Sequence, residues 1–191
     1  WESEAYQYWQ DQPTDQLLFG LVQGGMYDDL RQASRDTLTG YNFSGFAVGG
    51  VSVGEPMPMM HHIISTVTPT LPVQKPRYIM GIGLPENLEL AISAGADMFD
   101  CVLPTRLARH GQVFMHNHRR VSLKRAQFKY DPNPIQSDCD CYTCHQYSRA
   151  YLRHLLYAKE LLAATLLSIH NLRYLIRLVD TIRTRIIAKS R

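Results

Sequence analysis

The stretch PRYIMGIGLPENLELAISAGADMFDCVLP (residues 76–104) decides the fold, because it reads as a strand, a helix and a second strand in succession. The segments 76–82 and 97–104 are short and apolar, as buried strands are. Between them, residues 85–95 have the periodicity of an amphipathic helix, with a proline at its start and a glycine at its end. Two strands joined through a helix are typical of a right-handed crossover in a parallel sheet.

The same alternation of strand and helix is found upstream. The segments 17–23 and 45–50 read as further strands, and the segments 26–38 and 57–67 as further helices. Four strand–helix units suit either a doubly wound sheet or half of an eight-stranded (β/α)8 TIM barrel. A four-stranded half-barrel leaves two parallel edges unpaired, so its partner would be sequence outside this chain. The chain also starts at Trp1 rather than at a methionine, which suggests that residues precede it.

A different pattern begins at residue 111. The segments 111–115 and 119–130 predict a β-hairpin. From Tyr147 onward, leucine and isoleucine recur at helical spacing in two series, which predicts two C-terminal helices. We therefore expect two parts, 1–110 with the strand–helix units and 111–191 with the hairpin and the closing helices.

The charge of the chain is uneven along its length. The first 100 residues hold 4 Lys/Arg and 12 Asp/Glu, a net charge of −8, whereas residues 101–191 hold 16 and 5, a net charge of +11. A strongly basic half is typical of a nucleic-acid-binding surface, although solvated helix faces give the same count. The chain has no apolar run of about 18 residues and no basic-then-apolar N-terminus, so we expect neither a membrane span nor a signal peptide.

Three of the four cysteines fall within six residues: Cys139, Cys141 and Cys144. Cysteines this close are poor disulfide partners and good metal ligands, which favours a reducing cytoplasm. With one imidazole they offer the four ligands of a closed, structural zinc site. His170 and His154 are both candidates for the fourth ligand, and spacing alone leaves the choice open. The second half is therefore predicted to be a zinc-binding subdomain.

Asp100 is an acid in an otherwise apolar segment. If the segment is a strand, alternation places Met98, Asp100 and Val102 on one face. An acid near the carboxyl end of a parallel strand occupies the position at which barrel enzymes hold catalytic groups. The simpler alternative is a buried salt bridge to Arg106 or Arg109.

Glycines cluster where the first three predicted strands end. They lie in Gln23-Gly24-Gly25, in Gly49-Gly50 and in Gly81-Ile82-Gly83. Glycine lets a flat ligand approach the backbone closely, so three such ends beside Asp100 predict a pocket; taken singly, each is typical of a tight turn. The next segment, 105–109, carries two arginines that suit phosphates or bases, or that contact only water.

Six segments taken together resemble the tRNA-guanine transglycosylase family. They are LFGLVQGG, GFAVGGVSVGEP, PRYIMGIG, GADMFDCVLPTRLAR, CDCYTC and SIHNLRY, in this order along the chain. The resemblance covers residues 17 to about 187. It implies the second half of a (β/α)8 TIM barrel with an inserted zinc-binding subdomain, and a first half that lies outside this chain.

Members of this family exchange a guanine at the wobble position of a tRNA for a 7-deazaguanine base, in queuosine biosynthesis. The resemblance implies that Asp100 attacks C1′ of the ribose and forms a covalent intermediate, as a retaining glycosidase does. An ionised aspartate suits attack on an oxocarbenium-like centre, and the guanine has to be flipped out of its loop. The family's zinc ligands correspond to Cys139, Cys141, Cys144 and His170.

The resemblance also assigns the residues around the nucleophile. Gln23 and Gly50 would hydrogen-bond the base, and Glu55 would support the backbone around Val51 and Ser52. The full sets are, for the base, Gln23, Gly49, Gly50, Val51, Val53, Glu55, Met80 and Gly81, and, for the anticodon loop, Gly81, Ile82, Gly83, Leu84, Pro85, Glu86, Asn87, Thr105, Arg106, Leu107, Ala108 and Arg109.

Val53 bears on the choice of base. The bacterial type of the family has valine in this GGxxVGE segment, which is residues 49–55 here. The eukaryotic type has glycine, which leaves room for the cyclopentenediol of queuine. Val53 therefore predicts the smaller aminomethyl base, preQ1.

Further implications of the resemblance are a tRNA with a GUN anticodon as substrate, a homodimer with the zinc subdomain near its interface, and a cytoplasmic location without a membrane partner. The family's general acid/base aspartate and a second aspartate that reads the base lie in the first half of the barrel. The 191 residues alone are therefore expected to be inactive. The main alternative is a non-catalytic tRNA-binding subunit, or an inactive fragment, of this family. The presence of Asp100 argues against the non-catalytic subunit, because such subunits lack the nucleophile. An unrelated barrel hydrolase with a zinc knuckle would leave the basic half unexplained.

Overall fold

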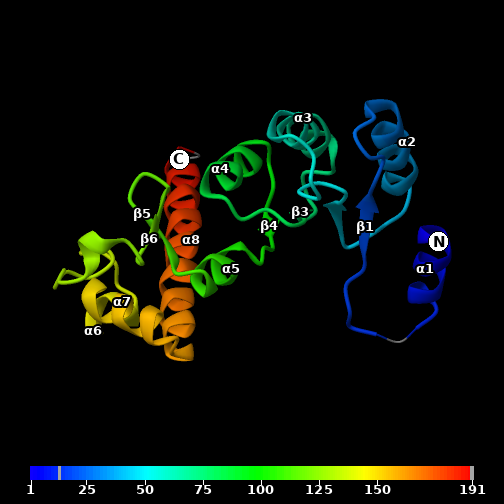
Figure 1. The fold of residues 1–191 in the computed structure, drawn as a ribbon. Helices are drawn as coiled ribbons and strands as arrows, with labels where there is room; N and C mark the ends of the chain where they lie inside the picture. Colours follow the sequence, from blue (N-terminus) through cyan, green and yellow to red (C-terminus); the bar gives the residue numbers. More distant parts are fainter. Residues whose placement is uncertain (13, 190–191) are drawn as a thin grey trace. The chain divides into compact units, whose positions relative to one another are not determined.

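In the computed structural model, which describes residues 1–12 and 14–189, the apolar segments predicted as strands pair into one parallel sheet (Figure 1). Strand order along the sheet follows the sequence, and the pairs Phe19–Gly45, Phe46–Arg77 and Tyr78–Met98 set the register. The strands are β1 (Phe19–Val22), β2 (Gly45–Val48), β3 (Arg77–Ile79) and β4 (Met98–Phe99).

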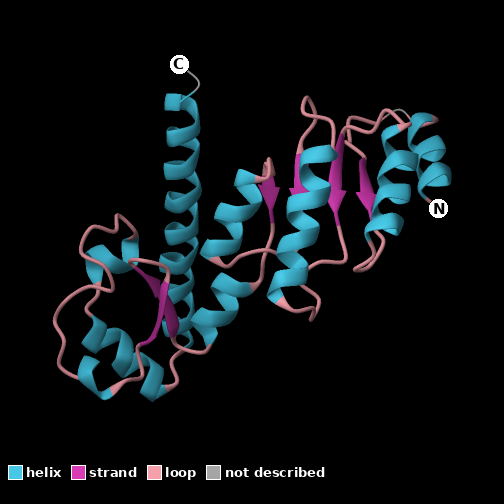
Figure 2. Ribbon diagram, turned by 90° about the horizontal axis from the view of Figure 1, so that it is seen from above, coloured by secondary structure: helices cyan, strands magenta, loops and turns pink. Residues whose placement is uncertain are grey.

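Three helices connect consecutive strands: α2 (Asp28–Thr39), α3 (Met57–Val67) and α4 (Pro85–Ser93), with a 3-10 turn at Thr68–Thr70 (Figure 2). Helix α2 contacts α3, and α3 contacts α4, so the three crossovers lie on the same face of the sheet. A doubly wound sheet carries helices on both faces and reverses its strand order at a switch point. This mixed α/β sheet does neither within the described residues.

Aromatic packing joins an N-terminal helix, to which sequence analysis assigned no element, to the sheet. Helix α1 (Glu2–Gln10) buries Tyr6, whose ring lies 5.1 Å from that of Tyr41 and 5.0 Å from that of Phe43. Phe43 in turn meets Phe46 of β2 edge-to-face. The strand β2 is buried along its whole length, which makes it the centre of the core of this unit.

The residues from Val102 onward form a second compact unit, distinct from Trp1–Cys101. Its helices are α5 (Leu103–Arg109), α6 (Tyr142–Gln146), α7 (Arg149–Ala158) and α8 (Leu161–Lys189), and its antiparallel hairpin is β5 (Gln112–Met115) with β6 (Arg119–Ser122), followed by a 3-10 turn at Ala126–Phe128. The hairpin and the two C-terminal helices confirm the predicted elements.

Asn171 of α8 joins three parts of this second unit. Its side-chain amide donates to the carbonyl oxygens of Pro104 and Gln112, at 2.9 and 3.1 Å, and its oxygen accepts from the backbone N–H of Phe114 at 3.0 Å. Pro104, Phe114 and Asn171 are buried and Gln112 is partly buried, and an unpaired polar group in such a place is costly. Helix α5 therefore packs with α8 and β5, whereas the domain boundary after residue 110 stays a prediction.

The predicted strands extend beyond the observed ones, most of all in two segments. The segment 97–104 forms a strand only at Met98–Phe99, because Pro104 lies in the first turn of α5 rather than at a strand end. Asp100 therefore follows the strand, and the alternation of faces cannot be extended to it or to Val102. In the segment 119–130, β6 ends at Ser122.

Among residues 1–12 and 14–189, no helix is both long enough and apolar enough to cross a bilayer.

Candidate functional site

Asp100 lies directly after β4 and is exposed on the first unit. One carboxylate oxygen, Oδ1, accepts a hydrogen bond of 2.6 Å from the phenol of Tyr78 and one of 2.8 Å from the backbone N–H of Gly81. Tyr78 belongs to β3, and Gly81 follows the same strand. One donor on β3 and one just after it thus hold the carboxylate at the carboxyl end of the sheet, in place of the predicted alternative of a buried salt bridge.

These two hydrogen bonds keep Asp100 ionised. The bond from Tyr78 is the largest effect that lowers the pKa of Asp100, and the N–H of Gly81 acts in the same direction. The same bond raises the pKa of Tyr78 to about 12, so the phenol stays protonated and continues to donate at neutral pH. The site therefore presents a fixed carboxylate anion with its second oxygen, Oδ2, outside this pair of bonds.

The ends of β1 and β2 meet at Gln23 and at Gly49-Gly50. The side-chain amide of Gln23 comes so close that a Cβ on Gly49 would lie 2.9 Å from its nitrogen, and a Cβ on Gly50 2.8 Å from its oxygen. Gly50 also has φ +62°, a conformation that L side chains rarely adopt. A side chain at Gly50 would therefore strain the backbone, and a Cβ at Gly49 would require the ends of the Leu21 and Gln23 side chains to shift.

Glu55 shapes the loop that follows Gly50. Its carboxylate accepts from the N–H of Ser52, and from the N–H of Val53 at 2.9 Å. Ser52 has φ +62°, so these bonds hold a strained backbone turn. The expected support around Val51 and Ser52 is found at Ser52 and Val53. The side chain of Val51 is buried, whereas that of Val53 is 77% exposed at the top of the loop.

The segment from Met80 to Asn87, predicted to contact a base and an anticodon loop, is mostly covered by its own unit. Asn87 is 4% exposed, and its oxygen lies 2.9 Å from Nε2 of His61 on α3. The side chain of Ile82 is buried as well, whereas Met80 and Glu86 are exposed and Leu84 is partly exposed. The accessible side chains of this segment are therefore those of Met80, Leu84 and Glu86.

The segment Thr105–Arg109 forms most of α5 in the second unit, and its residues face two ways. Leu107 and Ala108 are buried, and Ala108 belongs to the apolar core formed with α8. Arg106 and Arg109 are exposed and are the two residues of the segment available to a phosphate.

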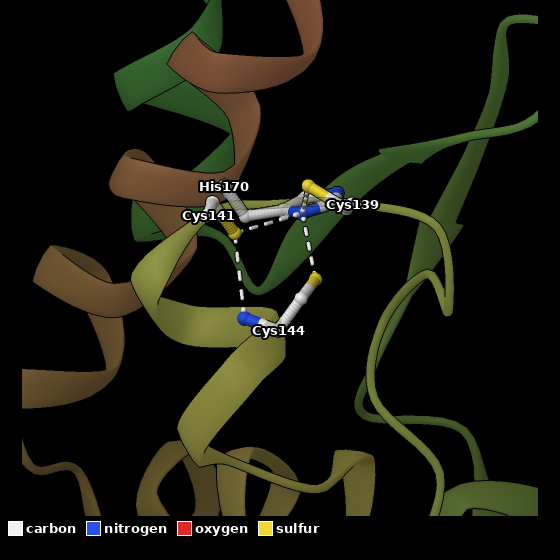
Figure 3. Close-up of side chains that lie close together, drawn as sticks. All are labelled: Cys139, Cys141, Cys144 and His170. Carbon is white, nitrogen blue, oxygen red and sulfur yellow. Dashed lines mark hydrogen bonds between the residues drawn. The ribbon is translucent and has the colours of Figure 1, made fainter.

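The metal-binding candidates Cys139, Cys141, Cys144 and His170 are brought together in the second unit (Figure 3). The Nδ1 atom of His170 lies 3.7, 3.7 and 3.3 Å from the three sulfur atoms, in chain order. A tetrahedral zinc ion with bonds of about 2.3 Å to sulfur and about 2.0 Å to nitrogen requires about 3.5 Å between these atoms. The four buried groups can therefore bind a metal ion, and their donor set is that of structural zinc.

The ring of His170 is oriented for this role by β5. Its Nε2–H donates to the carbonyl oxygen of Phe114 at 2.8 Å, which leaves the lone pair of Nδ1 facing the sulfur atoms. Of the two candidate histidines, His170 is the one that lies with the three cysteines, whereas His154 is exposed on α7. Cys144 lowers the pKa of the Cys141 thiol by a hydrogen bond, which favours the thiolate that zinc binds.

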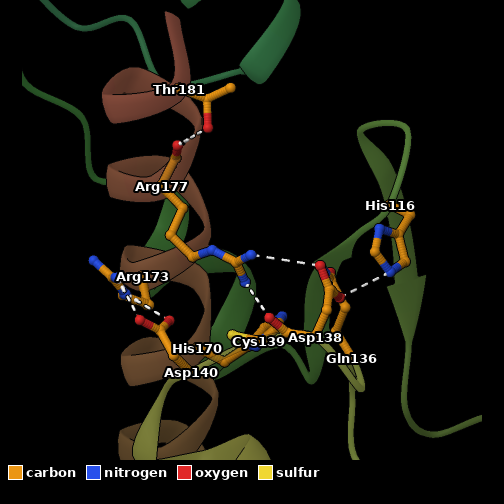
Figure 4. Close-up of polar contacts among 9 residues, drawn as sticks. All are labelled: His116, Gln136, Asp138, Cys139, Asp140, His170, Arg173, Arg177 and Thr181. Atoms are coloured by element: carbon orange, nitrogen blue, oxygen red, sulfur yellow. Dashed lines mark hydrogen bonds and ion pairs between the residues drawn. The ribbon is translucent and has the colours of Figure 1, made fainter. Parts of the chain in front are cut away.

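Two ion pairs tie the cysteine loop to α8 outside the metal ligands (Figure 4). Arg173 binds the carboxylate of Asp140 through Nε at 2.8 Å and Nη2 at 2.5 Å, and lowers the pKa of Asp140 to about 2. One turn later, Arg177 donates to the carbonyl oxygen of Asp138 at 2.8 Å and forms an ion pair of 3.4 Å with the Asp138 carboxylate. His116 from the hairpin lies 3.1 Å from the same Asp138 carboxylate. Exposed pairs contribute little singly, but these hold one short loop at two points.

Two residues of the first-unit site were missed by sequence analysis. Tyr78 is separated from Asp100 by 22 positions, and only the register of β3 against β4 brings them together. Arg31 is 1% exposed and binds backbone carbonyl oxygens at the ends of β1 and β2. The sequence did indicate that Arg31 is buried, because it lies seven residues before Leu38 and therefore on the same face of α2.

Comparison with known proteins gives a family match over nearly the whole chain. The family model described as queuine tRNA-ribosyltransferase matches residues 1–190.

Curated relatives with the name queuine tRNA-ribosyltransferase match at about half identity. The protein of Thermosynechococcus vestitus is 52% identical over 176 residues, which are 92% of this chain and 46% of the relative. That of Symbiobacterium thermophilum is 49% identical over 92% of this chain and 44% of its own length. That of Natranaerobius thermophilus is 49% identical over 97% of this chain and 50% of its own length. The chain thus spans about half the length of the curated relatives it matches.

Proposed function

The chain belongs to the queuine tRNA-ribosyltransferase family, and from this premise we propose that it forms the catalytic C-terminal half of an enzyme that exchanges a tRNA base. The reaction replaces guanine at the wobble position of the anticodon with a 7-deazaguanine base, within queuosine biosynthesis. The single observation that carries the proposal is the ionised carboxylate of Asp100, held by Tyr78 and Gly81 where the strands of the sheet end.

In the proposed reaction, Oδ2 of Asp100 attacks C1′ of the ribose. The C1′–O bond forms as the C1′–N9 bond to guanine breaks, and the guanine leaves with the electron pair and takes a proton from an acid outside this chain. The incoming base then gives up its N9 proton and attacks C1′, which releases the Asp100 carboxylate. Two displacements return the ribose to its original configuration.

The base would lie between the ends of β1 and β2 and the start of the loop after β3. Gln23 and Gly50 would donate and accept at its edge, supported by Gly49 and Val51, and Met80 and Gly81 would form a wall. Val53, exposed on the loop that Glu55 holds, would limit the substituent on the base, which favours preQ1 over queuine. The closeness of Gln23 to Gly49 and Gly50 supports this placement.

The sheet is proposed to be half of a (β/α)8 TIM barrel. Its sequential strand order and its crossovers on one face support the barrel over a doubly wound sheet. The other half would come from sequence that precedes the matched region in the relatives, and it would supply the general acid/base. The isolated 191 residues are therefore proposed to be inactive.

The tRNA is proposed to carry a GUN anticodon and to be contacted by the segment 81–87 and by 105–109. The exposed Arg106 and Arg109 support phosphate contacts from α5, because each guanidinium can neutralise one backbone charge. A homodimer and a cytoplasmic location are proposed on the family resemblance. Zinc, held by the three cysteines and His170, would fix the second unit and take no part in the exchange.

A non-catalytic tRNA-binding subunit is the competing function. It would need no nucleophile, whereas here the Asp100 carboxylate is ionised, exposed and fixed by two donors.

The test joins this chain to the part of the Thermosynechococcus vestitus relative that precedes the matched region, and measures incorporation of radiolabelled guanine into unmodified tRNA. This full-length fusion enzyme should exchange guanine, its Asp100→Asn variant should not, and the matched variant Asp29→Asn, at an exposed aspartate of α2, should exchange like the parent. Equal exchange by Asp100→Asn and the parent removes Asp100 from the reaction. Binding of tRNA without exchange by any form favours the non-catalytic subunit.

A further inference from the structure

A buried arginine lies behind the base pocket without a carboxylate partner. The guanidinium of Arg31 is 1% exposed and forms no ion pair with any residue in 1–12 or 14–189. Instead it donates to four backbone carbonyl oxygens, those of Gly25 (2.9 Å), Val22 (3.1 Å), Gly49 (2.7 Å) and Gly50 (3.2 Å). Burying a full charge against neutral groups costs free energy, and an apolar side chain would stabilise the fold at this position without that cost.

The four carbonyl groups belong to the two strand ends that form the pocket. Val22 and Gly25 flank Gln23 at the end of β1, and Gly49 and Gly50 follow β2. One side chain on α2 therefore fixes both ends relative to each other. The planar fork of arginine allows this, because it carries five donors in fixed directions, whereas a lysine offers a single point charge.

Holding a carbonyl oxygen also fixes the next N–H group. In a trans peptide the C=O and the following N–H point in opposite directions. With the oxygens of Gly49 and Gly50 bound to Arg31, the N–H groups of Gly50 and Val51 point away from it. Neither N–H donates to an acceptor within the described part of the chain, and the Gln23 side chain lies against Gly50. Two backbone donors without an acceptor among the described residues thus point away from Arg31.

From this geometry we propose that Arg31 is a positioning residue of the base pocket, which aims the N–H groups of Gly50 and Val51 at an acceptor edge of the purine. The inference rests on the proposed function and deepens it. The buried positive charge also polarises the two peptide groups, so their N–H groups donate more strongly as negative charge develops on the leaving guanine. Glu55, which lies close enough to raise the pKa of Arg31 against the lowering effect of burial, offsets part of the cost.

The test compares Arg31→Met and Arg31→Lys with Arg35→Met in the full-length fusion enzyme. Arg35 lies one turn further along α2 and pairs with Asp36 on the surface, so it is a matched control. Three quantities are measured: KM for the free base, KM for tRNA, and the fraction of enzyme that forms a covalent RNA complex at saturating tRNA. Equilibrium dialysis with labelled guanine gives base affinity without turnover.

Arg31→Met is expected to raise the base KM and the dialysis Kd by about tenfold or more, with the tRNA KM within about threefold of the parent, as loss of aligned donors requires. The base KM and Kd of Arg31→Lys should lie between those of the parent and of Arg31→Met, and those of Arg35→Met should equal the parent's. If Arg31→Met only lowers the active fraction and leaves base affinity unchanged, Arg31 is a structural residue and the inference is wrong. If the Arg31→Met protein does not fold, the Arg31→Lys variant decides. A base affinity of Arg31→Lys equal to that of the parent then overturns the positioning role of Arg31. A parent enzyme that binds base but does not exchange it contradicts the proposed function and leaves the dialysis comparison decisive for Arg31.

Discussion

The phenol of Tyr78 donates a hydrogen bond of 2.6 Å to the carboxylate of Asp100, across neighbouring strands of the parallel sheet. This bond lowers the pKa of Asp100 and raises that of Tyr78 to about 12. It also leaves the other carboxylate oxygen, Oδ2, outside these bonds, because Oδ1 is bound to Tyr78 and Gly81. In the proposed reaction, a carboxylate held in this way would be ionised and oriented before the ribose arrives.

Tyr78→Phe should therefore move the acid limb of the pH–rate profile to higher pH. Without the phenol the pKa of Asp100 rises, so Asp100 becomes protonated, and loses its nucleophilic form, at a higher pH than in the parent. The measurement is kcat/KM for guanine exchange as a function of pH. Tyr8→Phe, at an exposed tyrosine of α1, should leave the profile in place. An unchanged acid limb in Tyr78→Phe contradicts the assignment of Asp100 as the titrating nucleophile.

Zinc should be required for the stability of the second unit. We expect about one zinc ion per chain, loss of the metal in Cys144→Ser, and a large fall in Tm when a strong chelator removes it, because structural zinc contributes on the order of 10 kcal/mol in small domains. Cys101→Ser, outside the cluster, should keep its zinc. Metal analysis and thermal denaturation provide the measurements. A Cys144→Ser protein with full zinc content would show that the cluster is not the metal site.

Val53→Gly should widen the range of bases accepted. We propose that the exposed valine side chain limits the substituent on the 7-deazaguanine, and Glu55 holds the backbone N–H of this residue whatever its side chain. Relative kcat/KM for queuine over preQ1 is expected to rise about tenfold or more, which corresponds to relief of one steric clash. Val73→Gly removes a similarly exposed valine as a control. If the two bases lose activity in equal proportion, Val53 does not select between them.

Arg106→Gln and Arg109→Gln should weaken tRNA binding and leave the base KM unchanged. Each exposed guanidinium of α5 that contacts a phosphate releases one counterion, so each variant should reduce the slope of log affinity against log salt by about one. Arg183→Gln on α8 serves as the surface control. A salt dependence identical to that of the parent would place the RNA away from α5.

Much of the fold and the metal centre could be predicted from local sequence. The strands are short apolar segments, and the three cysteines lie within six residues, so both leave a strong local pattern. His170 lies 26 positions beyond Cys144, and spacing alone left it and His154 as equal candidates for the fourth ligand. In the structure, the hydrogen bond of its Nε2 to the Phe114 carbonyl oxygen turns Nδ1 of His170 toward the cysteines.

The parts that sequence analysis missed depend on contacts between distant residues. Tyr78 meets Asp100 through strand register, and Arg31 binds backbone carbonyl oxygens, which carry no residue-type signature. The strand at Asp100 was predicted too long because Pro104 reads equally well as the end of a strand and as the first turn of a helix. Tertiary packing of α5 on α8 decides in favour of the helix.

The most direct test of the account is to identify the residue that becomes attached to RNA. The full-length fusion enzyme is incubated with unmodified tRNA, denatured, digested with nuclease and protease, and its peptides are analysed by mass spectrometry. The account predicts a ribonucleotide remnant that lacks its base on the peptide containing Asp100, and no adduct in Asp100→Asn. An adduct on any other residue, or base exchange by the parent enzyme without an adduct under conditions that trap one, would contradict it.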